Sequence, residues 1–163
     1  MAELWLDDGY EEIDLMNGHA GLLHALRVDN IEYGALYIPL EAGYFAHQGQ
    51  VEIQLQRKLP QNCYELKFAL MRDFEAGIPE YTVPEQWDDL GQLTFRQAMT
   101  LGNGLFQSSW MLRRHVRVQG FVAVALEERR QLGSYYGRLL QRYQGQLGFD
   151  VHPVLDGAGY AIF

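Results

Sequence analysis

Cysteine is almost absent from this chain, which has one, Cys63, among 163 residues. A lone thiol cannot form an internal disulfide, and it cannot build a thiolate metal site without further ligands. No apolar run reaches the ~18 residues that a membrane-spanning helix needs. The first residues also lack the basic segment and apolar stretch of a signal peptide. We therefore expect no membrane association and a cytoplasmic location, or assembly into a soluble particle or complex.

Established catalytic signatures are also missing from the sequence. It contains no GxSxG elbow, phosphate-binding Walker loop, HExxH, CxxC or complete dinucleotide fingerprint. The serines have no neighbouring motif that would activate them, so nucleophilic catalysis has little support. Whether the protein is an enzyme stays open from the sequence.

Lysine is scarce as well, because it occurs only as Lys58 and Lys67 and the other eleven basic side chains are arginines. Residues 1–89 carry a net charge of −12 and residues 90–163 a net charge of +4, which together give the net charge of −8. Opposite charges on two parts of one chain favour self-complementary contact, within one fold or between copies. The acidic total makes nucleic acid an unlikely partner, since phosphate binding needs an excess of cations.

Length and composition predict one globular domain. A chain of this size fits a single hydrophobic core, and 48% hydrophobic residues are typical of a folded protein. We predict a single α+β domain over residues 1–163, with an acidic part at 1–89 and a basic part at 90–163. Its sheet is expected to be mixed or mainly antiparallel, with about three helices packed on it as a single layer.

The acidic part is predicted to contain a helix, a strand and a hairpin. Apolar residues between 13 and 26 have a loosely helical spacing, and residues 31–38 form a strand that Pro39 closes. Alternation in VEIQLQ and YELKF predicts an antiparallel hairpin over residues 51–71, with Leu59-Pro60-Gln61-Asn62 as its turn.

The basic part begins after a connector at residues 73–91, which is rich in acids, proline and glycine. Thr94 is expected to cap a helix with Phe95, Met99, Phe106 and Trp110 on one side and a kink or break at Gly102-Asn103-Gly104. A buried strand within residues 116–124, a long helix over 127–147 and a closing hairpin over 149–163 follow.

Two acidic clusters are candidate interaction surfaces. The first lies near the N-terminus, where its spacing lacks the pattern of a calcium loop, and the second flanks a tryptophan that could anchor a partner or fill the core. Their members are Asp7, Asp8, Glu11 and Glu12 in the first, and Trp87, Asp88 and Asp89 in the second.

Arginines of the basic part form the complementary candidate surface. Guanidinium groups bind carboxylates and phosphates and stack on aromatic rings, although glutamates at 127 and 128 can pair with some of them within the helix. The candidates are Arg113, Arg114, Arg117, Arg130 and Arg138.

Histidines give no metal-site pattern. His19 and His24 are five residues apart, so they do not share a helix face as residues four apart would. His152 lies in a strand-like run, where a structural role is the ordinary interpretation. We predict no metal site.

The predicted order of elements and one motif resemble the acyl-coenzyme A-dependent GNAT acetyltransferases. Tyr143-Gln144-Gly145-Gln146-Leu147-Gly148-Phe149 is similar to the aromatic-x-x-x-Leu-Gly-Phe ending common near their C-termini. The family's phosphate-binding loop is missing between Leu70 and Thr94; residues 130–135, RQLGSY, approximate it but end in tyrosine and lie late in the chain. The resemblance implies an N-acyltransferase with acetyl-coenzyme A as its cofactor.

Two functions follow from these observations. The first is a non-catalytic interaction or assembly subunit without a cofactor, part of a homo-oligomer or larger complex such as a phage particle or secretion apparatus. The alternative is a GNAT-like acyltransferase or small-ligand-binding protein. The charge division and the missing motifs favour the first.

Overall fold

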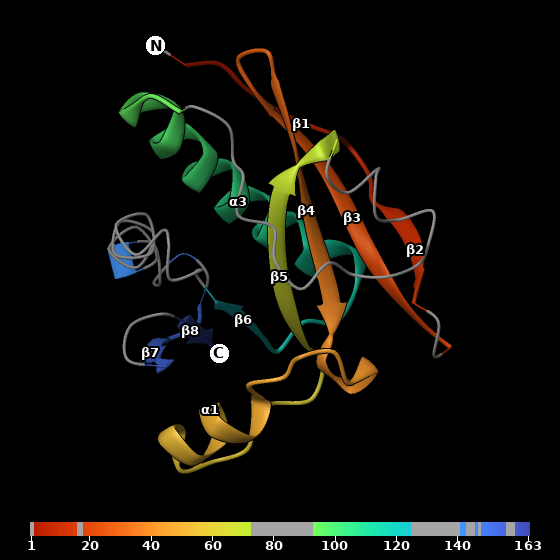
Figure 1. The fold of residues 1–163 in the computed structure, drawn as a ribbon, viewed down its shortest axis with the longest axis vertical. Coiled ribbons are helices and arrows are strands. Elements are labelled where there is room, and N and C mark those ends of the chain that lie inside the picture. Colours follow the sequence, from red (N-terminus) through yellow and green to blue (C-terminus); the bar gives the residue numbers. More distant parts are fainter. Residues whose placement is uncertain are drawn as a thin grey trace.

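In the part of the chain that the structure describes, the strands form one eight-stranded sheet (Figure 1). The computed structural model describes residues 2–15, 18–72, 93–124, 141–142, 146, 148–155 and 159–163. The strand order is β1-β3-β4-β5-β6-β8-β7, and β2 also pairs with β3. Every pairing is antiparallel except β5 with β6, so the predicted α+β class with a mixed, mostly antiparallel sheet is confirmed. The strands are β1 (Leu4–Leu6), β2 (Glu11–Leu15), β3 (His19–Val28), β4 (Ile31–Pro39), β5 (Cys63–Leu70), β6 (Gly120–Val124), β7 (Val151–Val154) and β8 (Gly159–Ile162).

The described residues contain two α-helices, fewer than the three expected. They are α1 (Gln48–Leu55) and α3 (Phe95–His115), and a short 3-10 turn occupies Leu40–Ala42. The helix predicted over residues 127–147 falls almost wholly outside the described residues.

The two helices do not form one layer. Leu101, Leu105 and Leu112 of α3 pack in one cluster with odd-numbered residues of β4 and with Leu70 of β5. Val51 of α1 packs in another cluster with Cys63. Successive side chains of a strand point to opposite faces, so Cys63 of β5 and Leu70 of the same strand lie on opposite faces. The helices therefore cover opposite faces, and the predicted single layer is not confirmed.

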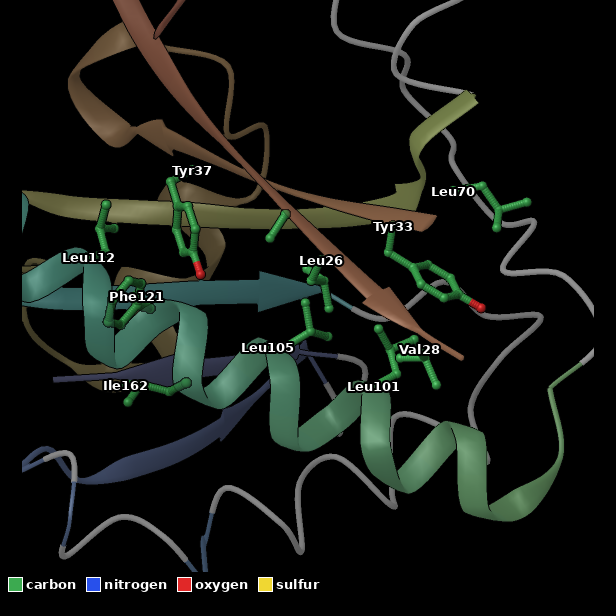
Figure 2. Close-up of a cluster of buried hydrophobic side chains, with 11 residues drawn as sticks. Leu26, Val28, Tyr33, Tyr37, Leu70, Leu101, Leu105, Leu112, Phe121 and Ile162 are labelled. Atoms are coloured by element: carbon green, nitrogen blue, oxygen red, sulfur yellow. The ribbon is translucent and has the colours of Figure 1, made fainter. Parts of the chain in front are cut away.

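The main core lies between α3 and the sheet (Figure 2). Tyr33 and Tyr37 extend from β4 towards the helix, and both are fully buried. Burying two large aromatic rings removes much apolar surface from water, which makes this cluster a principal source of stability.

Helix α3 begins where the sequence predicts and continues where a break is expected. The Thr94 side chain accepts a hydrogen bond from the Gln97 amide while the Gln97 side chain accepts one from the Thr94 amide, which completes a capping box. Gly104 does not break the helix. A Cβ there would lie 2.8 Å from Leu4 Cδ1 and 3.1 Å from Leu26 Cδ1, so glycine lets the helix approach the sheet closely.

The expected side of α3 is not the core side. Phe95 is 72% exposed and Trp110 39% exposed, while the buried positions include Leu101, Leu105 and Leu112. The four predicted residues do share a helix face, but the small and aliphatic residues between them pack on the sheet. The face that packs on the sheet is not the most aromatic one, because Gly102, Gly104 and the serines let the helix approach the sheet more closely than aromatic rings would.

The helix predicted over residues 13–26 is wrong. These residues form β2 and β3, and Gly18 adopts φ 83° in the connection between them. Glycine is favoured at a positive φ and disfavoured inside a helix. The two glycines of this segment, Gly18 and Gly21, were therefore the better guide than the apolar spacing.

The first strand of the predicted hairpin is also wrong, while its second is confirmed as β5. Val51 and Leu55 lie one helical turn apart and face the sheet from α1, whereas Ile53 is 78% exposed. A strand would have placed all three on one face. Alternation over six residues did not distinguish the strand period of two residues from the helical period of 3.6 residues, because Ile53 is an apolar residue at the surface.

The remaining expectations fare better. The strand over residues 31–38 is β4, the closing hairpin is β7 and β8, and the strand expected within residues 116–124 is β6, confined to Gly120–Val124.

Candidate functional site

A hydrogen-bonded network lies in the α3 face of the sheet. His24 Nδ1 is 2.6 Å from Ser108 Oγ, and Tyr37 Oη is 2.7 Å from the same oxygen and 3.1 Å from Ser109 Oγ. His24 Nε2 is 2.8 Å from the carbonyl oxygen of Asp7. The network therefore joins β3, β4, α3 and the connection between β1 and β2.

The partners fix the proton positions in this network. The Asp7 carbonyl can only accept, so His24 Nε2 carries the proton and Nδ1 of the neutral ring accepts from Ser108. The Ser109 hydroxyl donates to the Leu105 carbonyl, 3.0 Å away, so Tyr37 donates to a serine oxygen. Burial lowers the pKa of His24, and it raises the pKa of Tyr37 to about 12. Both groups are therefore neutral at pH 7.

The serine–histidine pair in this network is structural. A nucleophile and base in hydrogen-bond contact are the usual sign of covalent catalysis, but His24 and Ser108 are both 0% exposed. Tyr10 also covers the His24 ring, with centroids 4.5 Å apart, and donates a hydrogen bond to the Ser108 carbonyl. A substrate cannot reach Ser108 without displacing Tyr10.

The second candidate is the point where β5 and β6 separate, which we call the fork. The two strands are parallel and pair only at Cys63, Tyr64 and Glu65 of β5 with Gly120, Phe121 and Val122 of β6. Beyond these pairs, β5 continues along β4 to Leu70, while β6 continues along β8 (Figure 1). Among the described strands, none pairs with this edge of β5 over residues 66–70.

Glu65 occupies the last paired position before the strands separate. Its neighbours across the sheet are Ile38 of β4 and Val122 of β6, each 1% exposed. Glu65 itself is 7% exposed, and its Oε1 is buried without a hydrogen-bond partner. Burial raises the pKa of its carboxyl group, and the charge of Lys67 opposes this shift. An unpaired buried carboxyl group costs stability.

The acidic and basic interaction candidates adjoin each other in one molecule. Asp7 and Asp8 follow β1, Glu11 and Glu12 belong to β2, and all four are exposed. The residues Arg113, Arg114 and Arg117 are exposed at and beyond the end of α3. Tyr10, in the middle of the acidic segment, contacts the His115 ring at 4.9 Å between centroids. The fold thus brings the acidic segment beside the end of the basic helix.

Five other candidates lie outside the described residues, namely Trp87, Asp88, Asp89, Arg130 and Arg138. Nothing in the structure bears on their predicted roles.

Sequence reasoning missed both buried sites. Alternation in YELKF predicted that Leu66 and Phe68 are buried and that Lys67 faces water. In the structure, Cys63, Glu65 and Ala69 are more buried than either, because both faces of β5 are covered. The sequence signal for this site was that Glu65 lies in a run of mostly apolar residues, CYELKFAL, which is typical of a central strand. His24 had a similar signal in LLHALRV, where it interrupts an apolar run.

Three further features of the described residues concern metal ions, the membrane and the thiol of Cys63. Among the described residues, no group of three or more histidine, cysteine, aspartate or glutamate side chains could hold a metal ion. Within the same part of the chain, no helix has the length and apolar character to span a bilayer. Burial raises the pKa of the Cys63 thiol to about 12, which leaves it a poor nucleophile.

Comparison with known proteins gives no relative. No family model, no curated protein and no solved structure matches this chain.

Proposed function

We propose that the fork binds an acyl-coenzyme A thioester and that the protein transfers the acyl group to an amine. The observation that carries this proposal is the buried, unpaired carboxyl group of Glu65 at the point where two parallel strands separate. Ligands of open α/β sheets commonly bind beyond the carboxyl ends of strands at such a change of direction.

The edge of β5 supports a ligand of this chemistry. The pantetheine arm of coenzyme A is long and contains two amides, and an extended amide chain can pair with an exposed strand edge. Among the described strands, β6 pairs with β5 only as far as Glu65, so we place the pantetheine arm on the β6 side of the following residues of β5. In the described residues β5, α3, β6, β7 and β8 follow one another, and the GNAT resemblance implies the same order with a further helix between β6 and β7.

Glu65 supplies a proton acceptor for the transfer. The amine nitrogen attacks the thioester carbonyl carbon, Glu65 takes a proton from that nitrogen, the C–S bond breaks, and Glu65 gives the proton to the leaving thiolate, which leaves the amide and the free thiol. A carboxylate whose pKa is raised by burial holds that proton more readily than an exposed one.

One departure from the family affects the expected affinity. The phosphate-binding loop is missing from the sequence between Leu70 and Thr94, so the pyrophosphate lacks its usual backbone donors. We therefore expect the pantetheine arm to carry most of the binding free energy.

Calorimetry and a thiol-release assay test the proposal. Wild-type protein should bind acetyl-coenzyme A and release free thiol with an amine acceptor. Glu65→Gln should bind within about twofold of wild type while thiol release falls at least about 100-fold, the usual effect of losing a general base. Glu11→Gln, which changes an exposed glutamate of β2, is the matched control and should behave as wild type. No heat of binding at millimolar acetyl-coenzyme A, or full activity of Glu65→Gln, contradicts the proposal.

A second function, an interaction or assembly subunit that associates with itself, is favoured by a different observation. Trp5 is 45% exposed with the Arg27 guanidinium 5.1 Å from its ring, and the Arg113 guanidinium is 5.5 Å from the Trp110 ring. Tryptophan and arginine are enriched among residues that dominate protein interfaces. We keep self-association as the second proposal. Sedimentation at low and high salt tests it, since a monomer under both conditions contradicts it.

A further inference from the structure

Both ring nitrogens of His24 are used by neutral partners. Nε2–H donates to the Asp7 carbonyl and Nδ1 accepts from Ser108. A protonated ring would donate from both nitrogens, so the Ser108 hydroxyl would no longer donate to Nδ1 and would turn its hydrogen towards Tyr37. The same ring links the connection between β1 and β2 to helix α3.

A protonated ring has no ion-pair partner in contact with it in this site. The charged or titratable groups that face the ring are Asp7 and Tyr10 from the β1–β2 connection, Tyr37 from β4 and His115 from α3. Asp7 approaches with its carbonyl, and its exposed carboxylate attracts the ring only through space; His115 repels a positive charge there. The two phenols stay neutral at acidic pH. A charged ring with 0% exposure therefore costs free energy unless it reaches water.

The route to water passes through Tyr10. Its ring covers His24 at 4.5 Å between centroids, and it contacts His115 on the other side. Moving Tyr10 away requires the segment from Asp7 to Tyr10 to leave α3, and it would release the hydrogen bond from the Asp7 amide to the Ala25 carbonyl.

We propose that His24 is an acid-sensitive latch that holds the Asp7–Tyr10 segment against helix α3 only while its ring is neutral. This inference is independent of the acyl-transfer proposal. The sign follows from linkage: a histidine whose pKa is lowered in the closed state stabilises that state least at acidic pH. Closure is lost as pH falls below about 6.5, the ordinary histidine value, towards the lowered one.

Hydrogen exchange and nitrogen NMR test the latch. Corrected for intrinsic chemistry, the protection factor of the Asp7 amide should fall by up to tenfold per pH unit between about pH 6.5 and 5, the limit for one proton. His24→Gln keeps a donor for the Asp7 carbonyl and cannot titrate, so its protection should change less than about twofold. His47→Gln, at an exposed position, is the control and should follow wild type.

The wild-type ring provides a second measurement that does not depend on a variant folding. Nitrogen shifts should show His24 as the neutral Nε2–H tautomer at pH 7. The proposal is overturned if the ring carries its proton on Nδ1, if it titrates at 6.5 or above without loss of protection, or if His24→Gln loses protection as wild type does.

Discussion

The two faces of the sheet bury one polar side chain each in contrasting ways. On the α3 face, His24 has both ring nitrogens hydrogen bonded. On the opposite face, Glu65 has a buried oxygen without a partner. A satisfied polar network stabilises and orients the elements that it joins, whereas an unsatisfied carboxyl group costs stability and is retained where it serves another purpose. We therefore interpret the His24 network as structural and Glu65 as the candidate catalytic group.

The largest expected effect comes from removing the satisfied group. His24→Leu leaves Ser108 without its acceptor and the Asp7 carbonyl without its donor, so we expect a loss of about 2–4 kcal/mol in the free energy of unfolding. Urea denaturation at pH 7.5 measures it. His47→Leu, at an exposed position, should change the value by less than about 0.5 kcal/mol. A small effect of His24→Leu would mean that the network does not join the elements as described.

A glycine pair tests how closely α3 must approach this face. Gly104→Ala places a Cβ against Leu4 and Leu26 and should destabilise by about 1–2 kcal/mol despite the better helix propensity of alanine. Gly49→Ala in α1 meets no atom within 4 Å and should stabilise by about 0.5–1 kcal/mol. Equal signs for the two variants in thermal unfolding would contradict the close docking of α3.

The capping box gives a smaller change. Thr94→Ala removes the acceptor for the Gln97 amide and should cost about 1 kcal/mol. Thr94→Ser keeps the acceptor and should recover most of that loss in the same urea experiment.

Replacing Glu65, whose carboxyl group has a buried oxygen without a partner, should change the free energy of unfolding least, and it should raise the value where His24→Leu lowers it. Glu65→Leu removes a buried carboxyl group, so stability at pH 7 should be unchanged or increased by up to about 1 kcal/mol. The raised pKa of Glu65 means that its contribution is present below about pH 4.5 and is lost as pH rises through the folded-state value. The variant should therefore gain on wild type from pH 4.5 upward. A marked loss at pH 7 would show that Glu65 has a stabilising partner.

Sequence patterns predicted best the elements whose ends carry local signals. Thr94 and Gln97 specify the start of α3 locally, and Pro39 limits β4, so these features could be predicted without tertiary contacts. The helix at residues 48–55 and the strands at residues 11–28 could not, because their type depends on what covers them. Ile53 is exposed, which a strand pattern at residues 51–55 did not predict. Gly21 packs against Leu36, which a helix over residues 13–26 did not predict.

The candidate sites depended even more on tertiary structure. His24, Tyr37 and Ser108 are separated by up to 84 residues and meet only after α3 docks. The acidic cluster at Asp7 was visible in the sequence, but its contact with the end of α3 is made by Tyr10, in the connection between β1 and β2. In the sequence Glu65 resembles any polar residue of an alternating strand. Its burial follows only from the fold, in which both faces of β5 are covered.

Backbone NMR during titration with acetyl-coenzyme A tests the functional contrast between the two faces most directly. The account predicts that the largest amide shifts occur at residues 65–70 of β5 and 121–124 of β6, while the amides of His24 and Ser108 barely move. Shifts centred on the His24 network, or none at millimolar ligand, would contradict it.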